Sequence, residues 1–142
     1  MFKLLIGGDV CPINSNEECF ISRDRREILG GIAAEVDDSD FFAVNLESPL
    51  TNSQLKSKKS GANIKASPET INGFVQMGVD LVFSANNHIG DYGEQGVIDT
   101  IDICNKNGVK LIGSGNGAEE ASRPYIHESD GYSVGFLNYA DT

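Results

Sequence analysis

The sequence contains little cysteine, and its cysteines form no recognisable framework. Three cysteines, at positions 11, 19 and 104, occur among 142 residues. An odd number without zinc-finger spacing argues against a disulfide scaffold and against a structural zinc site. We therefore expect reduced thiols and a cytoplasmic location.

Basic residues and long apolar runs are also scarce. The chain has 11 lysines and arginines against 21 acidic residues, which gives a formal net charge of -10. This charge disfavours nucleic acid and anionic membrane surfaces as partners, because both are negatively charged. The apolar run within the first ten residues, MFKLLIGGDV, is too short for a signal peptide or a membrane span. We expect neither an anchor nor an export signal in this chain.

The composition is otherwise that of a globular domain, with 39% apolar and 23% charged residues. Short apolar runs bounded by turn residues alternate with segments of helical period. The predicted strands are 3–8, 41–47, 79–85 and 109–113, and the predicted helices are 24–38, 67–78 and 94–108. This alternation predicts an α/β fold built of parallel βαβ units. The segment 124–140 instead alternates like a β-hairpin, with a turn at residues 129–131.

Polar residues follow three of the four predicted strands at the point where each strand ends. They are Asp9, Asn45, Glu47, Asn86, Asn87 and His88. In a parallel sheet these ends meet at one edge, where ligands bind. Carboxylate, amide and imidazole groups together suit Zn, Mn or Fe at a hydrolytic centre. We therefore expect the third strand to stop so that Asn87 and His88 can face this site.

Each residue also has a structural interpretation. Asp9 could simply cap a turn, Glu47 could be a solvated loop carboxylate, and a single histidine is more often an ordinary surface or core residue than a ligand. The coincidence of Asp9, Glu47 and His88 at equivalent positions is what favours a site.

Several segments resemble the poly-gamma-glutamate capsule-biosynthesis family of CapA type, a branch of the calcineurin-like metallophosphoesterases. They are GGDV, VNLESPLT, ASPETI, GVDLVFSANNHIGDYGEQGVIDTI and GSGNGAEEASRPYI. The resemblance implies a four-layer αββα sandwich with a site for two divalent transition metal ions. It also implies that Asp9 bridges the metals, that Glu47 is the acidic residue of the second motif, that Asn87 binds metal, and that His88 polarises the phosphoryl oxygen or the leaving group.

The sequence departs from the wider superfamily in two ways. Where the first motif usually reads Asp-x-His, this chain has Asp9-Val10-Cys11, and we interpret Cys11 as a bystander thiol rather than a ligand. The superfamily also draws histidine ligands from its C-terminal half, whereas only His88 and His127 are present here, and we interpret His127 as structural. We therefore expect residues 1–142 to be a single domain that is incomplete at its C-terminus and binds metal weakly by itself.

Four lysines, at positions 56, 58, 59 and 65, lie in the loop after the second predicted strand. They could steer an anionic small molecule or polymer, such as a phosphate or polyglutamate, although a solvated loop is the favoured interpretation. Lys65 and Asn45 are the two candidates for substrate binding.

Two other functions remain open. The segment GSGNGA at 113–118 fits the dinucleotide pattern G-x-G-x-x-A, but Pro124 leaves no room for the full helix that this fingerprint needs. The alternative to an enzyme is a non-catalytic scaffold of a polymer synthesis or export complex, at the cell envelope where members of the resembled family often work.

Overall fold

A computed structural model of the chain describes residues 1–129 and 131–141. Its centre is a parallel sheet of four strands in the order β1 (Leu4–Val10), β2 (Phe41–Leu46), β3 (Leu81–Phe83) and β4 (Lys110–Ile112). β2 is an interior strand and is buried along almost its whole length, as expected for a continuous apolar run in a parallel sheet. The predicted α/β fold with parallel βαβ units is confirmed.

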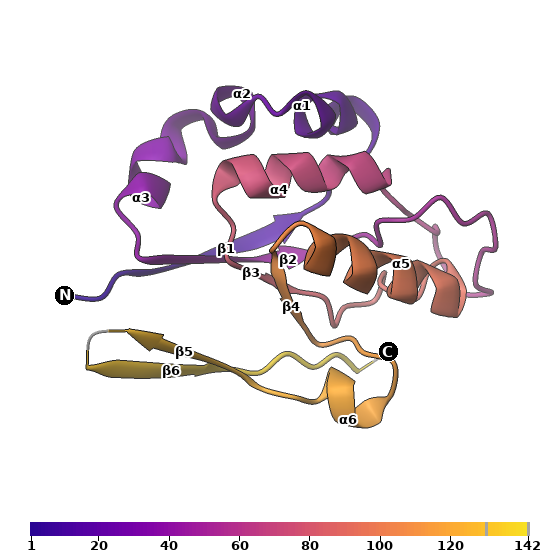
Figure 1. Cartoon of the computed structure of the whole chain (residues 1–142). Coiled ribbons are helices and arrows are strands. Elements are labelled where there is room, and N and C mark those ends of the chain that lie inside the picture. Colours follow the sequence, from indigo (N-terminus) through magenta and orange to yellow (C-terminus); the bar gives the residue numbers. More distant parts are fainter. Residues whose placement is uncertain (130, 142) are drawn as a thin grey trace.

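Helices cover one face of this sheet (Figure 1). They are α1 (Glu17–Ser22), α2 (Arg25–Leu29), α3 (Ala33–Asp37), α4 (Ile71–Met77) and α5 (Gly93–Lys106). Their buried side chains share one core with β2 and β3, and Phe74 of α4 lies at its centre with no exposed surface. α1 packs on α4 through Phe20, whose ring centroid lies 5.4 Å from that of Phe74.

The single helix predicted for residues 24–38 is wrong, because the chain breaks it at the glycine pair. Gly30 has a φ of 51°, in the left-handed region that favours glycine, and a 3-10 turn (Gly30–Ile32) separates α2 from α3. Leu29 and Val36 are still buried, as their spacing predicts, but Ile32 is turned outward and is 53% exposed. The prediction also missed α1.

The other two predicted helices are confirmed. Pro68 opens a 3-10 turn (Pro68–Thr70) that leads into α4, and α4 ends at Gly78, whose φ of 81° provides the left-handed C-cap. α5 buries Ile101 and Cys104, and Cys104 packs in the core shared with β2 and β3.

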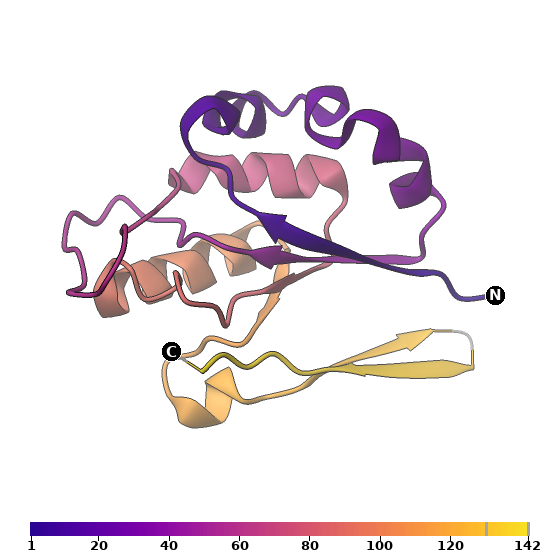
Figure 2. The ribbon, with the colours of Figure 1, turned by 180° about the vertical axis from the view of Figure 1, so that it is seen from behind.

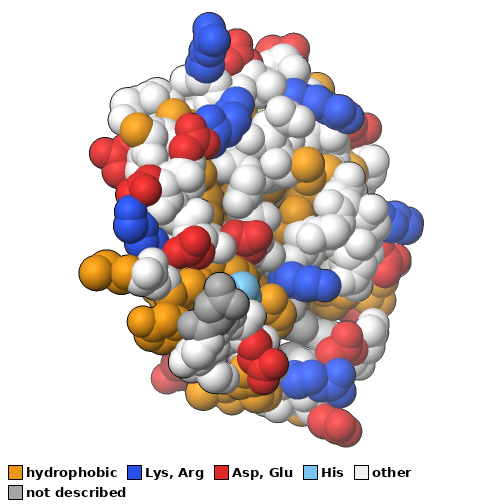
Figure 3. All heavy atoms as spheres, turned by 60° about the vertical axis from the view of Figure 1, so that its left-hand side comes forward, with side chains coloured by type: hydrophobic (Ala, Val, Ile, Leu, Met, Phe, Trp, Pro, Cys, Tyr) orange, Lys and Arg blue, Asp and Glu red, His pale blue; other side chains and the backbone are white. Residues whose placement is uncertain are grey.

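The opposite face of the sheet carries the predicted hairpin, β5 (Tyr125–Ser129) paired antiparallel with β6 (Tyr132–Phe136). Figure 2 shows it from behind as a separate layer. The Phe136 side chain packs on Phe41, and the ring of His127 lies 4.4 Å from that of Phe41, which agrees with a structural role for His127. Apolar side chains gather around the hairpin on the molecular surface (Figure 3). Asp130, in the predicted turn, lies outside the described residues.

Two further features of the helices bear on function. Helix α6 (Ala118–Ala121), which begins at the last residue of the GSGNGA segment, has only four residues, so the full helix of a dinucleotide fingerprint is missing. Among the residues that the structure describes, none of the helices combines the length and the apolar character needed to cross a membrane.

Candidate functional site

A bulge in β1 sets the position of Asp9. Ile6 is paired with Ala43, yet Asp9 rather than Gly8 is paired with Asn45, so two glycines of β1 lie opposite the single residue Val44 of β2. One additional residue in a strand moves each following side chain to the other face. Through this shift the side chain of Asp9 is aligned with that of Asn45.

Asn45 connects the ends of three strands. Its amide nitrogen donates to Oδ1 of Asp9 at 2.8 Å, and its amide oxygen accepts a hydrogen bond of 3.2 Å from Nδ2 of Asn86. Asn86 also donates to the main-chain oxygen of Leu46 at 2.9 Å. The predicted gathering of polar residues at one edge of the sheet is therefore present for these side chains.

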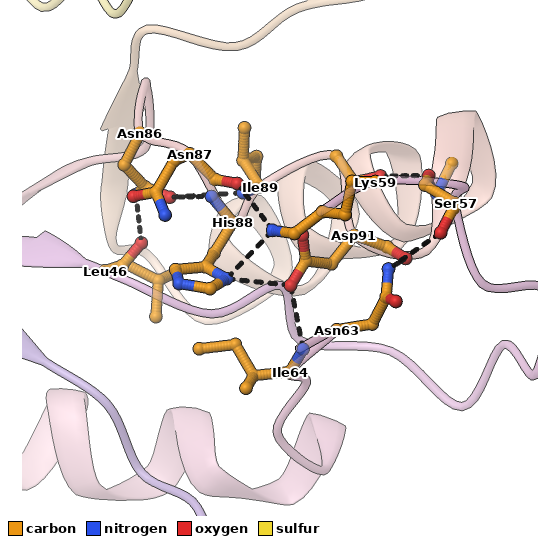
Figure 4. A network of polar contacts seen from close by, with 12 residues as sticks. Leu46, Ser57, Lys59, Asn63, Ile64, Asn86, Asn87, His88, Ile89 and Asp91 are labelled. Carbon is orange, nitrogen blue, oxygen red and sulfur yellow. Dashed lines mark hydrogen bonds and ion pairs between the residues drawn. The ribbon is translucent and has the colours of Figure 1, made fainter. Parts of the chain in front are cut away.

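Asn86 lies three residues after the end of β3 and forms the turn that presents the next two residues. Its Oδ1 accepts hydrogen bonds from the main-chain nitrogens of His88 at 2.9 Å and Ile89 at 3.1 Å. In this Asx turn the side chain of Asn86 binds main-chain nitrogens that no longer pair with a neighbouring strand. Asn87 is exposed and His88 is partly buried in the turn after β3 (Figure 4). No separate role was predicted for Asn86.

Glu47 and Cys11 are neighbours beside Asp9. The main-chain nitrogen of Glu47 donates a hydrogen bond of 3.1 Å to the main-chain oxygen of Val10, and this bond joins the ends of β2 and β1. Burial, followed by the charge of Glu47 and a hydrogen bond to it, raises the pKa of the Cys11 thiol to about 11. Cys11 is therefore a neutral thiol near pH 7, and its interpretation as a bystander stays a prediction.

His88 belongs to a buried polar network centred on Asp91, the residue three positions later. Asp91 is 1% exposed. Its Oδ2 lies 2.8 Å from Nδ1 of His88 and accepts a 2.7 Å hydrogen bond from the main-chain nitrogen of Ile64, while its Oδ1 pairs with Lys59. Although burial raises the pKa of Asp91, the hydrogen bonds from Lys59, His88 and Ile64 and the charge of Lys59 lower it below its usual value.

The four lysines of the long loop, which we define as residues 51–66, have different surroundings. Lys59 reaches into the site, where its Nζ donates to the main-chain oxygen of Asn87 at 2.9 Å. Lys65 lies elsewhere. Its Nζ donates to the main-chain oxygen of Ser53 at 2.5 Å and lies 4.8 Å from the centroid of the Tyr92 ring. Lys56 and Lys58 are exposed.

A pocket of about 490 Å³ lies beside His88. It is lined by Lys59, Ser60, Gly61, Ala62, Asn87 and His88. One wall is thus the long loop and the other is the turn after β3. A cation, an imidazole and an exposed amide around one hollow are groups that can hold an anion.

The types of donor group at this edge fit a divalent metal ion but, where the structure describes the chain, few such side chains lie close together. Asp9, Glu47 and Asn87 offer two carboxylates and an amide, which are the oxygen ligands such ions accept. In the parts of the chain that the structure describes, no group of three or more histidine, cysteine, aspartate or glutamate side chains lies close enough together to hold a metal ion. The described residues thus bring candidate donors to one edge without forming such a group.

Comparison with known proteins identifies the family of the chain. The family model of the bacterial capsule synthesis protein PGA_cap matches residues 3–142. The chain belongs to this family. Among curated relatives, it is 28% identical over 105 residues to the PGA biosynthesis protein CapA of Bacillus subtilis (strain 168), and 28% identical over 107 residues to the capsule biosynthesis protein CapA of Bacillus anthracis.

These two matches cover 72% and 73% of this chain, but only 28% and 26% of the respective relatives. The chain therefore matches about a quarter of the length of the curated relatives. The predicted resemblance to the CapA-type family is confirmed.

Sequence reasoning missed the central residue of the network, Asp91. A usable signal was present, since His88 and Asp91 are three residues apart in a short turn and can therefore face each other. No comparable signal identifies Lys59 among its neighbours, because its contacts with Asp91 and Asn87 join segments distant in the sequence.

Proposed function

We propose that the edge formed by Asp9, Asn45, Glu47, Asn87 and His88 is part of a metal-dependent phosphoester hydrolase site that serves capsule synthesis. The observation that carries the proposal is the side-chain connection of the ends of β1 and β2 with the turn after β3, made by Asn45 through Asp9 and Asn86. It brings a carboxylate next to the turn that presents an amide and an imidazole, the donor set of such a centre. Membership of the capsule synthesis family supports the biological context.

Within this proposal, Asp9, Glu47 and Asn87 would hold a divalent transition metal ion, Mn, Fe or Zn. When bound, the ion supplies Lewis-acid polarisation of a phosphoryl group and activation of water. Further ligands, and a second ion, are proposed for a longer protein, because the matched region covers only about a quarter of the relatives.

His88 would act on the substrate itself. Its ring lies next to Asn87, and Nδ1 is hydrogen-bonded to Asp91. Nε2 is therefore the ring atom that can contact a phosphoryl oxygen or a leaving group. The adjacent pocket would hold the anionic substrate, a small molecule or a polymer, with Lys59 on its wall. A fixed cation and fixed dipoles stabilise developing negative charge at such a site.

One observation favours a second candidate, a non-catalytic scaffold in a polymer synthesis or export complex. Within the described residues, the ionisable metal-ligand side chains form no group of three or more, so turnover depends on ligands from elsewhere. A scaffold would keep the fold and the hydrogen-bonded edge without binding metal.

Hydrolysis of a chromogenic phosphodiester distinguishes the two functions. We expect the protein, in the longest form that its gene encodes and supplied with Mn²⁺, to hydrolyse the diester, and Asp9→Asn to lose most of this activity. A matched control is Asp102→Asn, which changes an exposed carboxylate on α5. Equal rates for the protein, for Asp9→Asn and for buffer with Mn²⁺ would support the scaffold.

A further inference from the structure

Asp91 has features that the proposed chemistry does not by itself require. It is a carboxylate with almost no exposed surface, at the turn that leads into α5. A buried charge is costly unless donors surround it. Here the donors are the side chains of Lys59 and His88 and the main-chain nitrogen of Ile64.

The contact with His88 determines where the imidazole carries its proton. An ionised carboxylate can only accept hydrogen bonds, so the 2.8 Å contact between Oδ2 of Asp91 and Nδ1 of His88 requires a proton on Nδ1. The competing arrangement, in which Nδ1 is unprotonated and accepts from Lys59, has a longer distance of 3.3 Å and would place two lone pairs against each other. The other ring nitrogen, Nε2, points away from Asp91 (Figure 4).

The main chain of Asp91 fastens the long loop. Its carbonyl oxygen accepts hydrogen bonds from the main-chain nitrogen of Ser57 at 2.9 Å and from Nδ2 of Asn63 at 2.8 Å. The loop has no helix or strand of its own between residues 51 and 65. Its conformation therefore depends on such fixed points.

The side chain of Asp91 also binds the long loop, at two further residues. Its two oxygens accept hydrogen bonds from Nζ of Lys59 and from the main-chain nitrogen of Ile64. The same Nζ also donates to the main-chain oxygen of Asn87. One carboxylate thus holds both walls of the pocket, the loop on one side and His88 on the other.

We propose that Asp91 is a positioning residue that fixes His88 with its proton on Nδ1 and, through Lys59 and Ile64, holds the long loop against the site. Its importance for catalysis rests on the proposed function, but the two structural effects do not. Partners of this kind orient the groups that touch substrate, and their removal commonly reduces activity by about 10- to 100-fold.

The ¹⁵N NMR spectrum of the His88 ring tests the first effect without any measurement of activity. At a pH at which the ring is neutral, we expect the proton on Nδ1 in the unchanged protein and in Lys59→Met. In Asp91→Asn the new amide can donate to Nδ1, so we expect the proton to move to Nε2. A proton on Nε2 in the unchanged protein would overturn the assignment even if Asp91→Asn failed to fold.

Amide hydrogen exchange tests the second effect. We expect exchange at Ile64 to become about 10- to 100-fold faster in Asp91→Asn, the range for loss of a hydrogen bond to a charged group. Lys59→Met should also accelerate exchange in the long loop, whereas Lys58→Met, which changes an exposed neighbour, should not. Unchanged exchange in both Asp91→Asn and Lys59→Met would refute the fastening of the loop.

These outcomes separate the inference from the proposed function. A protein without hydrolase activity can still show the Nδ1 proton and the fastened loop. An active protein with the proton on Nε2 would retain the hydrolase proposal and lose the role of Asp91.

Discussion

Asn45 donates a hydrogen bond of 2.8 Å to the carboxylate of Asp9 from the paired position on the neighbouring strand. The same amide accepts from Asn86, so a single uncharged side chain spans the gap between a candidate metal ligand and the turn that carries His88. An amide suits this place because it can donate to one neighbour and accept from the other.

Replacing Asn45 with alanine should therefore weaken both metal binding and folding. We expect the affinity for Mn²⁺ to fall about 10- to 100-fold, since Asp9 loses the partner that orients it. The loss of stability should be about 1 kcal/mol per hydrogen bond removed. Calorimetric titration with Mn²⁺ and urea unfolding measure the two effects. The control is Asn105→Ala on the exposed side of α5, and equal affinities in the two variants would contradict a role for Asn45.

The two glycines of the bulge in β1 differ in how much space a side chain would have. A Cβ added to Gly7 would lie 3.0 Å from Cγ1 of Val44, whereas one added to Gly8 would meet nothing within 4 Å. We expect Gly7→Ala to reduce the free energy of unfolding by about 1–3 kcal/mol through overpacking, and Gly8→Ala to change it much less. Urea unfolding of the two variants measures the difference. Equal losses would show that the contact with Val44 is not what fixes the bulge.

Much of this architecture can be predicted from sequence, because apolar runs and helical periods are local signals. The strands, α4, α5 and the hairpin follow from such patterns, and so does the place where polar residues follow the strands. The pairing of Asp9 with Asn45 depends instead on a register shift between two strands. Likewise, the break at Gly30 depends on a single left-handed residue inside a helical pattern.

The polar network shows the same limit. Lys59 and Lys65 are equally plausible in the sequence, yet one pairs with Asp91 and the other lies over Tyr92. What separates them is the path of a loop without regular secondary structure, and that path is set by contacts between distant segments.

Asp91 should make stability depend on pH. Its pKa is lower in the folded chain than its ordinary value, so in acid the unfolded chain binds more protons than the folded one. The stabilisation is therefore present above the ordinary pKa of aspartate and is lost as the pH falls through the lowered pKa. We expect this part of the acid dependence to disappear in Asp91→Asn and to persist in Asp102→Asn. Urea unfolding across the acid range measures it, and an unaltered slope in Asp91→Asn would contradict the assignment.

Metal content per chain tests the central claim most directly. Elemental analysis should be made on the longest form that the gene encodes, with Asp9→Ala and Asn87→Ala as site variants and Asp102→Ala as the control. A two-metal site predicts about two transition-metal ions per chain in the unchanged protein and in the control, and a clear loss in both site variants. Metal near zero in the unchanged protein, or content that is the same in all four proteins, would contradict the account and leave the scaffold.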